Sequence, residues 1–159
     1  MIKDFLFVGA QFLLMAAIAI ETSITNIVFG GHLNLGSLFL AIGFLIALTA
    51  VIQLNINLSP FPTPKKESTL ISKGIYGYLR HPIYTGIILM GLGCSIFTGN
   101  LDNLIFTILL GVLFYYKSTY EERLLSKKFP EYSKYKESTW KIFPFDTYWL
   151  KSKGAESTK

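Results

Sequence analysis

The side chains best suited to chemistry are concentrated in the segment 70–86, which reads LISKGIYGYLRHPIYTG. Pro82 can occupy the first turn of a helix, where its missing N–H group costs nothing. Arg80 and His81 would then lie beside the free backbone N–H groups at the start of that helix, a place that suits an anionic group such as a carboxylate. The glycines of the segment would let a ligand approach the backbone closely. The segment therefore predicts a ligand site at the start of an apolar stretch.

A second group of ionisable side chains follows at Lys117, Glu121 and Glu122. Lys117 and Glu121 are four residues apart, so on a helix they share one face. A ligand that carries both an ammonium and a carboxylate could use this group together with Arg80 and His81. The simpler alternative is a solvated helix face, and for Glu122 the two interpretations stay open.

The elements that must position these groups are four apolar stretches, at about 5–29, 35–58, 82–98 and 101–116. Backbone groups in hydrocarbon must bond within their own segment, so the stretches are predicted to be helices. The first stretch resembles a signal peptide, but its apolar character resumes at 24–29 and favours a retained membrane helix. The sequence thus predicts an all-α fold, an integral membrane bundle of about four transmembrane helices.

The fourth helix is expected to continue out of the membrane, because no turn signal separates Tyr116 from Phe129. Pro130 should then end it. An aromatic and lysine-rich segment follows. We expect residues 1–150 to form a single domain and residues 151–159 to be a disordered basic tail.

Positive charges predict the orientation of the helices. The chain carries a formal net charge of +5, yet residues 30–34 and 99–102 contain no Lys or Arg. The positive-inside rule therefore places both termini and the long middle loop in the cytoplasm, with the ligand site on the same side. The basic flanks suit anionic membrane lipids, and no nucleic-acid-binding module is recognisable. Cys94 is the single cysteine and is interpreted as a packing residue, and no metal site is predicted.

Two sequence boxes carry a resemblance to a known family. The segment 59–144 resembles the isoprenylcysteine carboxyl methyltransferase family, and the related phospholipid N-methyltransferases share parts of the pattern. The matching positions are Ser68-Thr69-Leu70-Ile71, Gly74-x-Tyr76, Arg80-His81-Pro82-x-Tyr84-x-Gly86, Glu121-Glu122-x-x-Leu125, Phe129 and Tyr132-x-x-Tyr135.

The resemblance implies a helical membrane bundle whose cytoplasmic half encloses S-adenosylmethionine. Glu121 would hold the amino group of this cofactor. Arg80 and Lys117 are the candidate catalytic residues, with Lys117 standing where the family has an Arg that contacts the substrate. Lys keeps the charge but not the bidentate fork. By position, the other cofactor-binding residues would be Ser68, Thr69, Leu70, Ile71, Tyr76, His81, Pro82, Ile83 and Tyr84.

The function predicted on this basis is an S-adenosylmethionine-dependent methyltransferase acting on a lipophilic or lipid-linked substrate. An isoprenylcysteine-like carboxylate, a phospholipid amine and a thiol all fit as acceptors. The sulfonium is an activated methyl donor, so the lack of an obvious base does not count against this function. The alternatives are a non-catalytic membrane lipid-binding or assembly module with the same fold, and a membrane reductase with a nicotinamide cofactor.

Overall fold

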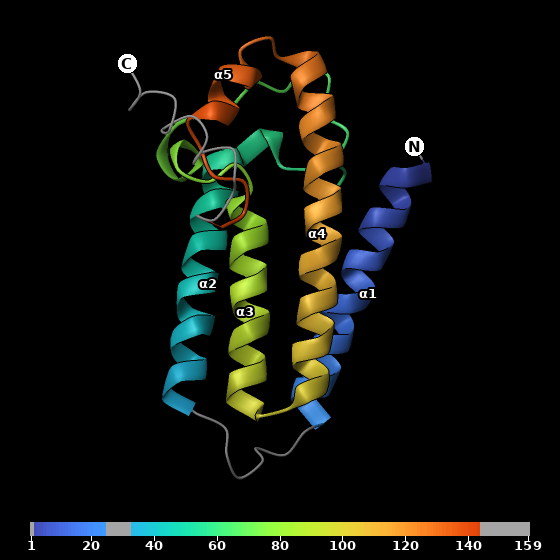
Figure 1. Ribbon diagram of the computed structural model, residues 1–159, viewed down its shortest axis with the longest axis vertical. Coiled ribbons are helices and arrows are strands. Elements are labelled where there is room, and N and C mark those ends of the chain that lie inside the picture. The colour runs from blue at the N-terminus through green and yellow to red at the C-terminus, as the bar shows by residue number, and fades with distance from the viewer. Residues whose placement is uncertain (1, 25–32, 144–159) are drawn as a thin grey trace, which may run out of the picture.

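The computed structural model describes residues 2–24 and 33–143. Four long helices run side by side in this part of the chain (Figure 1): α1 (Ile2–Ile24), α2 (Leu33–Leu54), α3 (Pro82–Thr98) and α4 (Leu101–Lys128). By length and composition α1, α2 and α4 can cross a membrane, and α3 is a shorter apolar helix. The predicted all-α membrane bundle is confirmed.

The helix bounds follow the expected spans with small differences. Helix α3 has the predicted limits, and α4 continues past Tyr116 to Lys128, two residues before Pro130, as expected. Helix α2 ends at Leu54, four residues earlier than predicted, and a short 3-10 helix η1 (Asn55–Asn57) follows it. The predicted end of the first span near residue 29 and the predicted tail at 151–159 lie outside the described residues.

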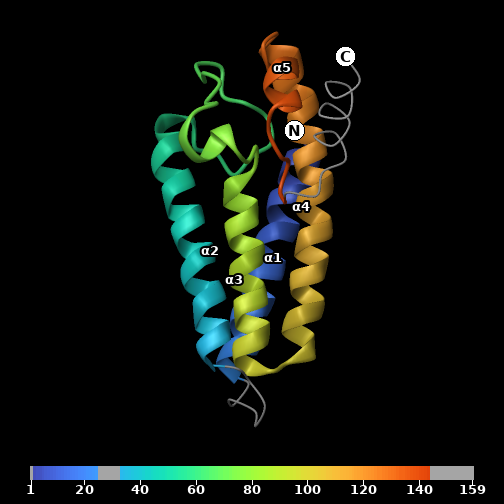
Figure 2. The ribbon, with the colours of Figure 1, turned by 60° about the vertical axis from the view of Figure 1, so that its left-hand side comes forward.

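Two short helices and a returning segment were not predicted. They are η2 (Gly74–Gly77), α5 (Tyr132–Glu137) and residues 138–143. A parallel bridge joins Leu79 to Trp140, and the backbone N–H of Arg80 donates to the carbonyl of Trp140 at 2.8 Å. The chain after α4 therefore returns to the start of α3. Figure 2 shows η2, α5 and the start of α1 at the same end of the bundle.

Glycines bring α2 and α3 into close contact. A Cβ atom at Gly43 would lie 2.6 Å from the carbonyl oxygen of Gly86, and one at Gly86 would lie 2.5 Å from the carbonyl oxygen of Gly43. Gly36 and Gly93 lie one layer further along the same two helices, and their added Cβ atoms would be equally crowded. Small residues let membrane helices approach in this way, where there is no water to drive association.

Replacing Gly43 with leucine should therefore force α2 away from α3. We expect a loss of about 1–3 kcal/mol, the usual cost of overpacking, seen as a lower midpoint of thermal unfolding in detergent. Gly9→Leu on α1 is the matched control, since a Cβ atom there meets nothing within 4 Å. Equal stability of the two variants would show that the α2–α3 contact is not tight.

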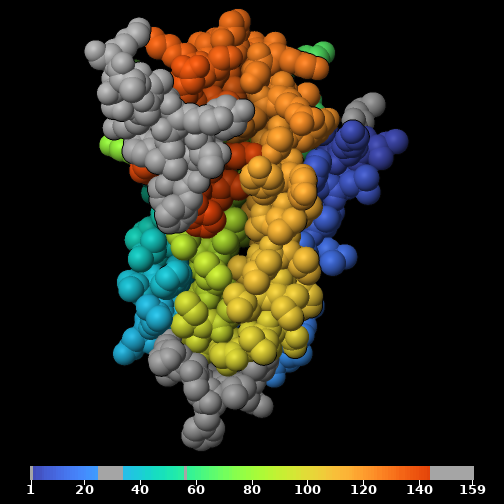
Figure 3. All heavy atoms as spheres, viewed as in Figure 1, coloured from blue at the N-terminus to red at the C-terminus, as the bar shows by residue number. Residues whose placement is uncertain are grey.

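Helices α1, α3 and α4 meet in the apolar core, which contains Ile18, Ile88, Leu110 and Phe114 together with Ile142 from the returning segment. Figure 3 shows α1 lying along α4. At the end of the bundle away from η2, Glu21 accepts a hydrogen bond from the Nδ2 of Asn100 at 3.4 Å. Glu21 is thus remote from the segment 70–86.

Candidate active site

A cavity of about 340 Å³ lies at the end of the bundle that carries η2 and α5, where the loop between α2 and α3 meets the helices. Its walls come from every helix of the bundle, including α5. The cavity is lined by all the residues for which the sequence predicted a role in binding or catalysis: Ser68, Thr69, Leu70, Ile71, Tyr76, Arg80, His81, Pro82, Ile83, Tyr84, Lys117 and Glu121.

Glu121 lies in the cavity wall, and one of its two carboxylate oxygens accepts a hydrogen bond from the protein. Its Oε2 accepts a hydrogen bond from the hydroxyl of Tyr84 at 2.9 Å and lies 3.5 Å from the Nδ1 of His81. The Tyr84 ring is itself fixed by stacking, with centroids 5.4 Å from His81 and 4.3 Å from Phe114. Within the described part of the chain, nothing donates a hydrogen bond to Oε1 of Glu121. That oxygen is available to a positively charged ligand.

Arg80 lines the cavity, but its guanidinium binds protein groups rather than solvent. The side chain is buried, its Nε donates to Oε1 of Glu122 at 2.8 Å, and its Nη1 donates to the carbonyl of Lys136 at 3.0 Å and to that of Thr139. These bonds join the start of α3 to α4, to α5 and to the chain that follows α5. The geometry gives Arg80 a positioning role, while direct contact with substrate stays a prediction.

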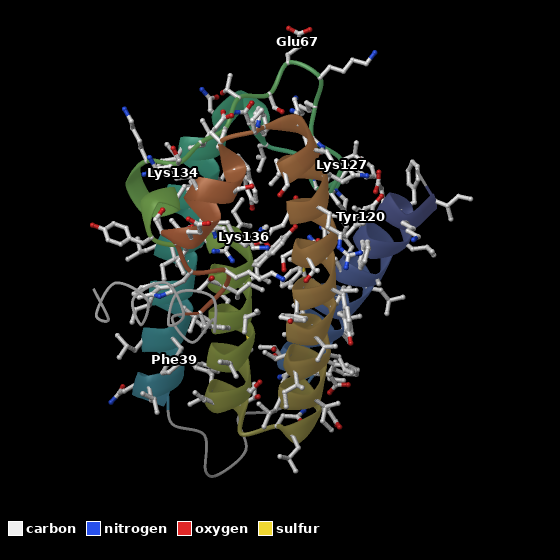
Figure 4. All side chains as sticks on the ribbon, turned by 45° about the horizontal axis from the view of Figure 1, so that its top comes forward. Phe39, Glu67, Tyr120, Lys127, Lys134 and Lys136 are labelled. Atoms are coloured by element: carbon white, nitrogen blue, oxygen red, sulfur yellow. The ribbon has the colours of Figure 1, made fainter. Side chains whose placement is uncertain are left out.

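Glu122 is a residue whose role the sequence left open. It is buried, its Oε1 lies 3.4 Å from the Nε2 of His81, and its Oε2 lies 3.1 Å from the Nζ of Lys136 (labelled in Figure 4). The side chains of successive residues on a helix point about 100° apart, so those of two adjacent glutamates point in different directions. Glu121 therefore faces the cavity, and Glu122 faces Arg80 and Lys136.

Lys117 is 1% exposed and reaches across the cavity towards α1. Its Nζ donates to Oε1 of Gln11 at 2.5 Å and to the carbonyl of Pro60 at 2.8 Å, and it lies 5.3 Å from the ring centroid of Tyr84. Gln11 was not among the predicted site residues. The available signal was an amide inside an apolar span, because polar side chains within membrane segments are costly and are often functional.

Local hydrogen bonds hold the remaining cavity walls. Lys128 donates to the hydroxyl of Ser68 at 2.7 Å, and the Nδ2 of Asn57 donates to the carbonyl of Thr69 at 3.3 Å. The Tyr76 hydroxyl donates to the carbonyl of Ala50 at 3.3 Å. Burial raises the pKa of Tyr76, so the phenol stays neutral and keeps this bond at physiological pH.

A comparison with known proteins identifies the family of this chain. The model of the phospholipid methyltransferase family matches residues 32–132, which is more than half of the chain and includes both sequence boxes. This chain belongs to the phospholipid methyltransferase family. It is also 30% identical over 115 residues to a protein-S-isoprenylcysteine O-methyltransferase of Schizosaccharomyces pombe. That alignment covers 70% of this chain and 49% of the relative, so the chain spans about half the length of the curated relative.

The family match and the similarity to the isoprenylcysteine methyltransferase confirm the resemblance that was predicted from the sequence. The family match includes α2, α3 and α4, and it ends before most of α5. It does not include α1, which supplies Gln11 to the cavity. The cavity of this family member is therefore completed by a helix outside the matched region.

Proposed function

We propose that this chain is a membrane-embedded methyltransferase that uses S-adenosylmethionine and acts on a lipophilic acceptor. The observation that carries the proposal is the cavity in which Glu121, with one oxygen lacking a hydrogen-bond partner among the described residues, lies near the start of α3. The membership of a methyltransferase family supports it.

The residues present fit this cofactor. A carboxylate such as Glu121 forms charge-assisted hydrogen bonds with an ammonium group. Ile83 and Tyr84 are in the first turn of α3 and line the cavity, and the backbone N–H groups of a first helical turn suit a carboxylate. An amino acid moiety could therefore lie between Glu121 and α3.

When bound, S-adenosylmethionine supplies a methyl group already activated by a positively charged sulfur. What the protein must do is align the acceptor and exclude water. Tyr84 donates a hydrogen bond to Glu121, and apolar side chains such as Val51, Leu54 and Phe61 form part of the cavity wall. A carboxylate or thiolate acceptor needs no base, and an amine needs only to be neutral.

The acceptor is proposed from the cavity and from the names of the relatives. The family description names phospholipids, and the yeast relative's name specifies isoprenylcysteine. Both combine a long apolar chain with a polar head, which matches a cavity bordered by apolar membrane helices. We infer that the acceptor reaches the cavity from the bilayer. Because the cavity takes walls from α1 to α5, residues 1–150 are proposed to act as one domain.

A transfer assay tests this function. Purified protein in detergent is given S-adenosylmethionine with a radiolabelled methyl group and, in separate arms, N-acetyl-farnesylcysteine, phosphatidylethanolamine and a membrane lipid extract. Label should enter at least one lipid fraction with the wild type, and Glu121→Ala should transfer label at least about tenfold more slowly when the cofactor is below its dissociation constant for that variant. Binding of S-adenosylhomocysteine without transfer in any arm would instead indicate a non-catalytic module.

The orientation is proposed from the charge distribution. Lys65, Lys66, Lys73, Lys127 and Lys128 lie at the end of the bundle that carries the cavity, and Figure 4 labels Lys127 there. The turn between α3 and α4 has no Lys or Arg. Reporters fused at either terminus should therefore be cytoplasmic, and a reporter inserted at Gly99 should be external. An external C-terminus would contradict both the orientation and a cytoplasmic site.

A further inference from the structure

The cavity is small for a reaction between two ligands. Its volume of about 340 Å³ is at the lower end of the range for a single drug-sized ligand. Methyl transfer needs the cofactor and the acceptor to be bound at the same time, so one wall of the cavity must move to admit the acceptor. Helix α3 packs against both α2 and α4, which makes the helical walls the least able to move.

Residues 59–64, here called the strap, form a wall of a different kind. The strap reads SPFPTP, and all six of its residues line the cavity. No backbone-to-backbone hydrogen bond joins the strap to the rest of the described chain. Its three prolines fix φ and lack an N–H donor, so the strap is stiff and depends on side chains for its position. Segments held in this way open at a lower free energy than packed helices.

The side chains that hold the strap come largely from the start of α1. The Thr63 hydroxyl donates a hydrogen bond to Oδ2 of Asp4 at 2.6 Å, and the ring of Phe61 packs edge-on against that of Phe5 with centroids 5.3 Å apart. Figure 1 shows the loop after α2 crossing towards the start of α1. A further attachment comes from α4, where Lys117 donates to the carbonyl of Pro60. The strap therefore joins two helices that it does not connect in sequence.

The burial of Asp4 makes the attachment to α1 easy to reverse. Asp4 is 5% exposed, and its Oδ1 is buried without a hydrogen-bond partner among the described residues. A buried carboxylate is costly unless its oxygens are hydrogen-bonded. This cost offsets part of the gain from the bond with Thr63, and water would repay it when the strap opens.

We propose that the strap is a movable wall that opens to admit the lipophilic acceptor beside the cofactor. The hydrogen bond between Asp4 and Thr63, here called the latch, sets how readily the strap opens. The proposal rests on the proposed function, because a reaction between two ligands is what requires the extra room. Asp4 precedes the region 32–132 that the family model matches, so the latch depends on a residue outside that region. Asp4 and Thr63 are positioning residues, since they act through the strap.

Thr63→Val tests the latch, because it keeps the shape of the side chain and leaves Asp4 with no partner when the strap is closed. Opening is measured on a thiol introduced by Val51→Cys, on the α2 wall of the cavity, in a Cys94→Ala background. The thiol is labelled with small N-ethylmaleimide and with bulky, apolar N-(1-pyrenyl)maleimide. Thr63→Val should raise the pyrenyl rate about fivefold or more and leave the N-ethyl rate within about twofold.

Two further variants separate the latch from a general loosening of the fold. Adding Asp4→Ala to Thr63→Val removes the unpaired carboxylate, so the pyrenyl rate should return to within about twofold of the original. Thr49→Val is the matched control, since the Thr49 hydroxyl bonds to the Leu45 carbonyl of its own helix and Thr49 does not line the cavity. It should leave both rates within about twofold.

An unchanged pyrenyl rate in Thr63→Val, or a further rise on adding Asp4→Ala, would overturn the proposal. In the transfer assay Thr63→Val should lower KM for the lipid acceptor and leave KM for the cofactor within about twofold. All labelling rates are measured with and without S-adenosylhomocysteine. A wild type that does not bind S-adenosylhomocysteine would refute the proposed function, whereas the rates measured without that ligand decide whether the strap moves.

Discussion

Replacing Glu122 with alanine should destabilise the protein by about 3–5 kcal/mol, the usual cost of leaving a buried charge without its partner. Glu122 contacts the guanidinium of Arg80 at 2.8 Å and the ammonium of Lys136 at 3.1 Å, and both Arg80 and Glu122 are buried. The cluster joins α4 to the start of α3 and to the returning segment. Unfolding in detergent, followed by circular dichroism or a thermal shift, measures the loss.

Two further variants show that this loss comes from the buried cluster. Glu131→Ala removes the same charge from an exposed position before α5 and should change stability by less than about 0.5 kcal/mol. Glu122→Gln keeps an acceptor for Arg80 and should fall between the wild type and Glu122→Ala. If Glu122→Ala and Glu131→Ala were equally stable, the cluster would contribute nothing to the fold.

Replacing Glu121 with alanine should weaken binding of S-adenosylhomocysteine by about 1.5–3 kcal/mol, or roughly 10- to 150-fold. The physical reason is the loss of a charge-assisted hydrogen bond to the ligand's ammonium group. Stability should change far less than in Glu122→Ala, since Glu121 contacts only Tyr84 and His81 in the described structure. Isothermal titration of the purified variant gives the affinity.

Tyr84→Phe provides a graded comparison at the same site. It keeps the ring that stacks on Phe114 and removes only the hydroxyl that donates to Glu121. The affinity should fall by about tenfold or less, because the carboxylate remains but is no longer held in one orientation. Wild-type affinity in a well-folded Glu121→Ala protein would show that Glu121 does not hold the ligand.

The contrast between the neighbouring glutamates shows what the sequence could predict about the site. The four-residue spacing of Lys117 and Glu121 placed both on one helix face, and both line the cavity. The spacing could not show that Lys117 turns to Gln11, because that contact joins residues 106 positions apart in the chain. For the same reason the partner of Arg80, 42 positions away at Glu122, was not identifiable.

The fold was predictable where the determinants are local. Apolar length, Gly99 and Pro130 predicted the limits of α3 and the end of α4 to within two residues. Helix α5 and the returning segment were missed, because they depend on distant contacts such as the bridge between Leu79 and Trp140. Only the folded chain brings these residues together.

The most direct test of the account is a titration of the purified wild-type protein with S-adenosylhomocysteine and, in parallel, with NADPH. The account predicts saturable binding of S-adenosylhomocysteine in the micromolar range, on the order of −8 kcal/mol, and no binding of NADPH. Binding of NADPH without S-adenosylhomocysteine would contradict it and indicate a reductase.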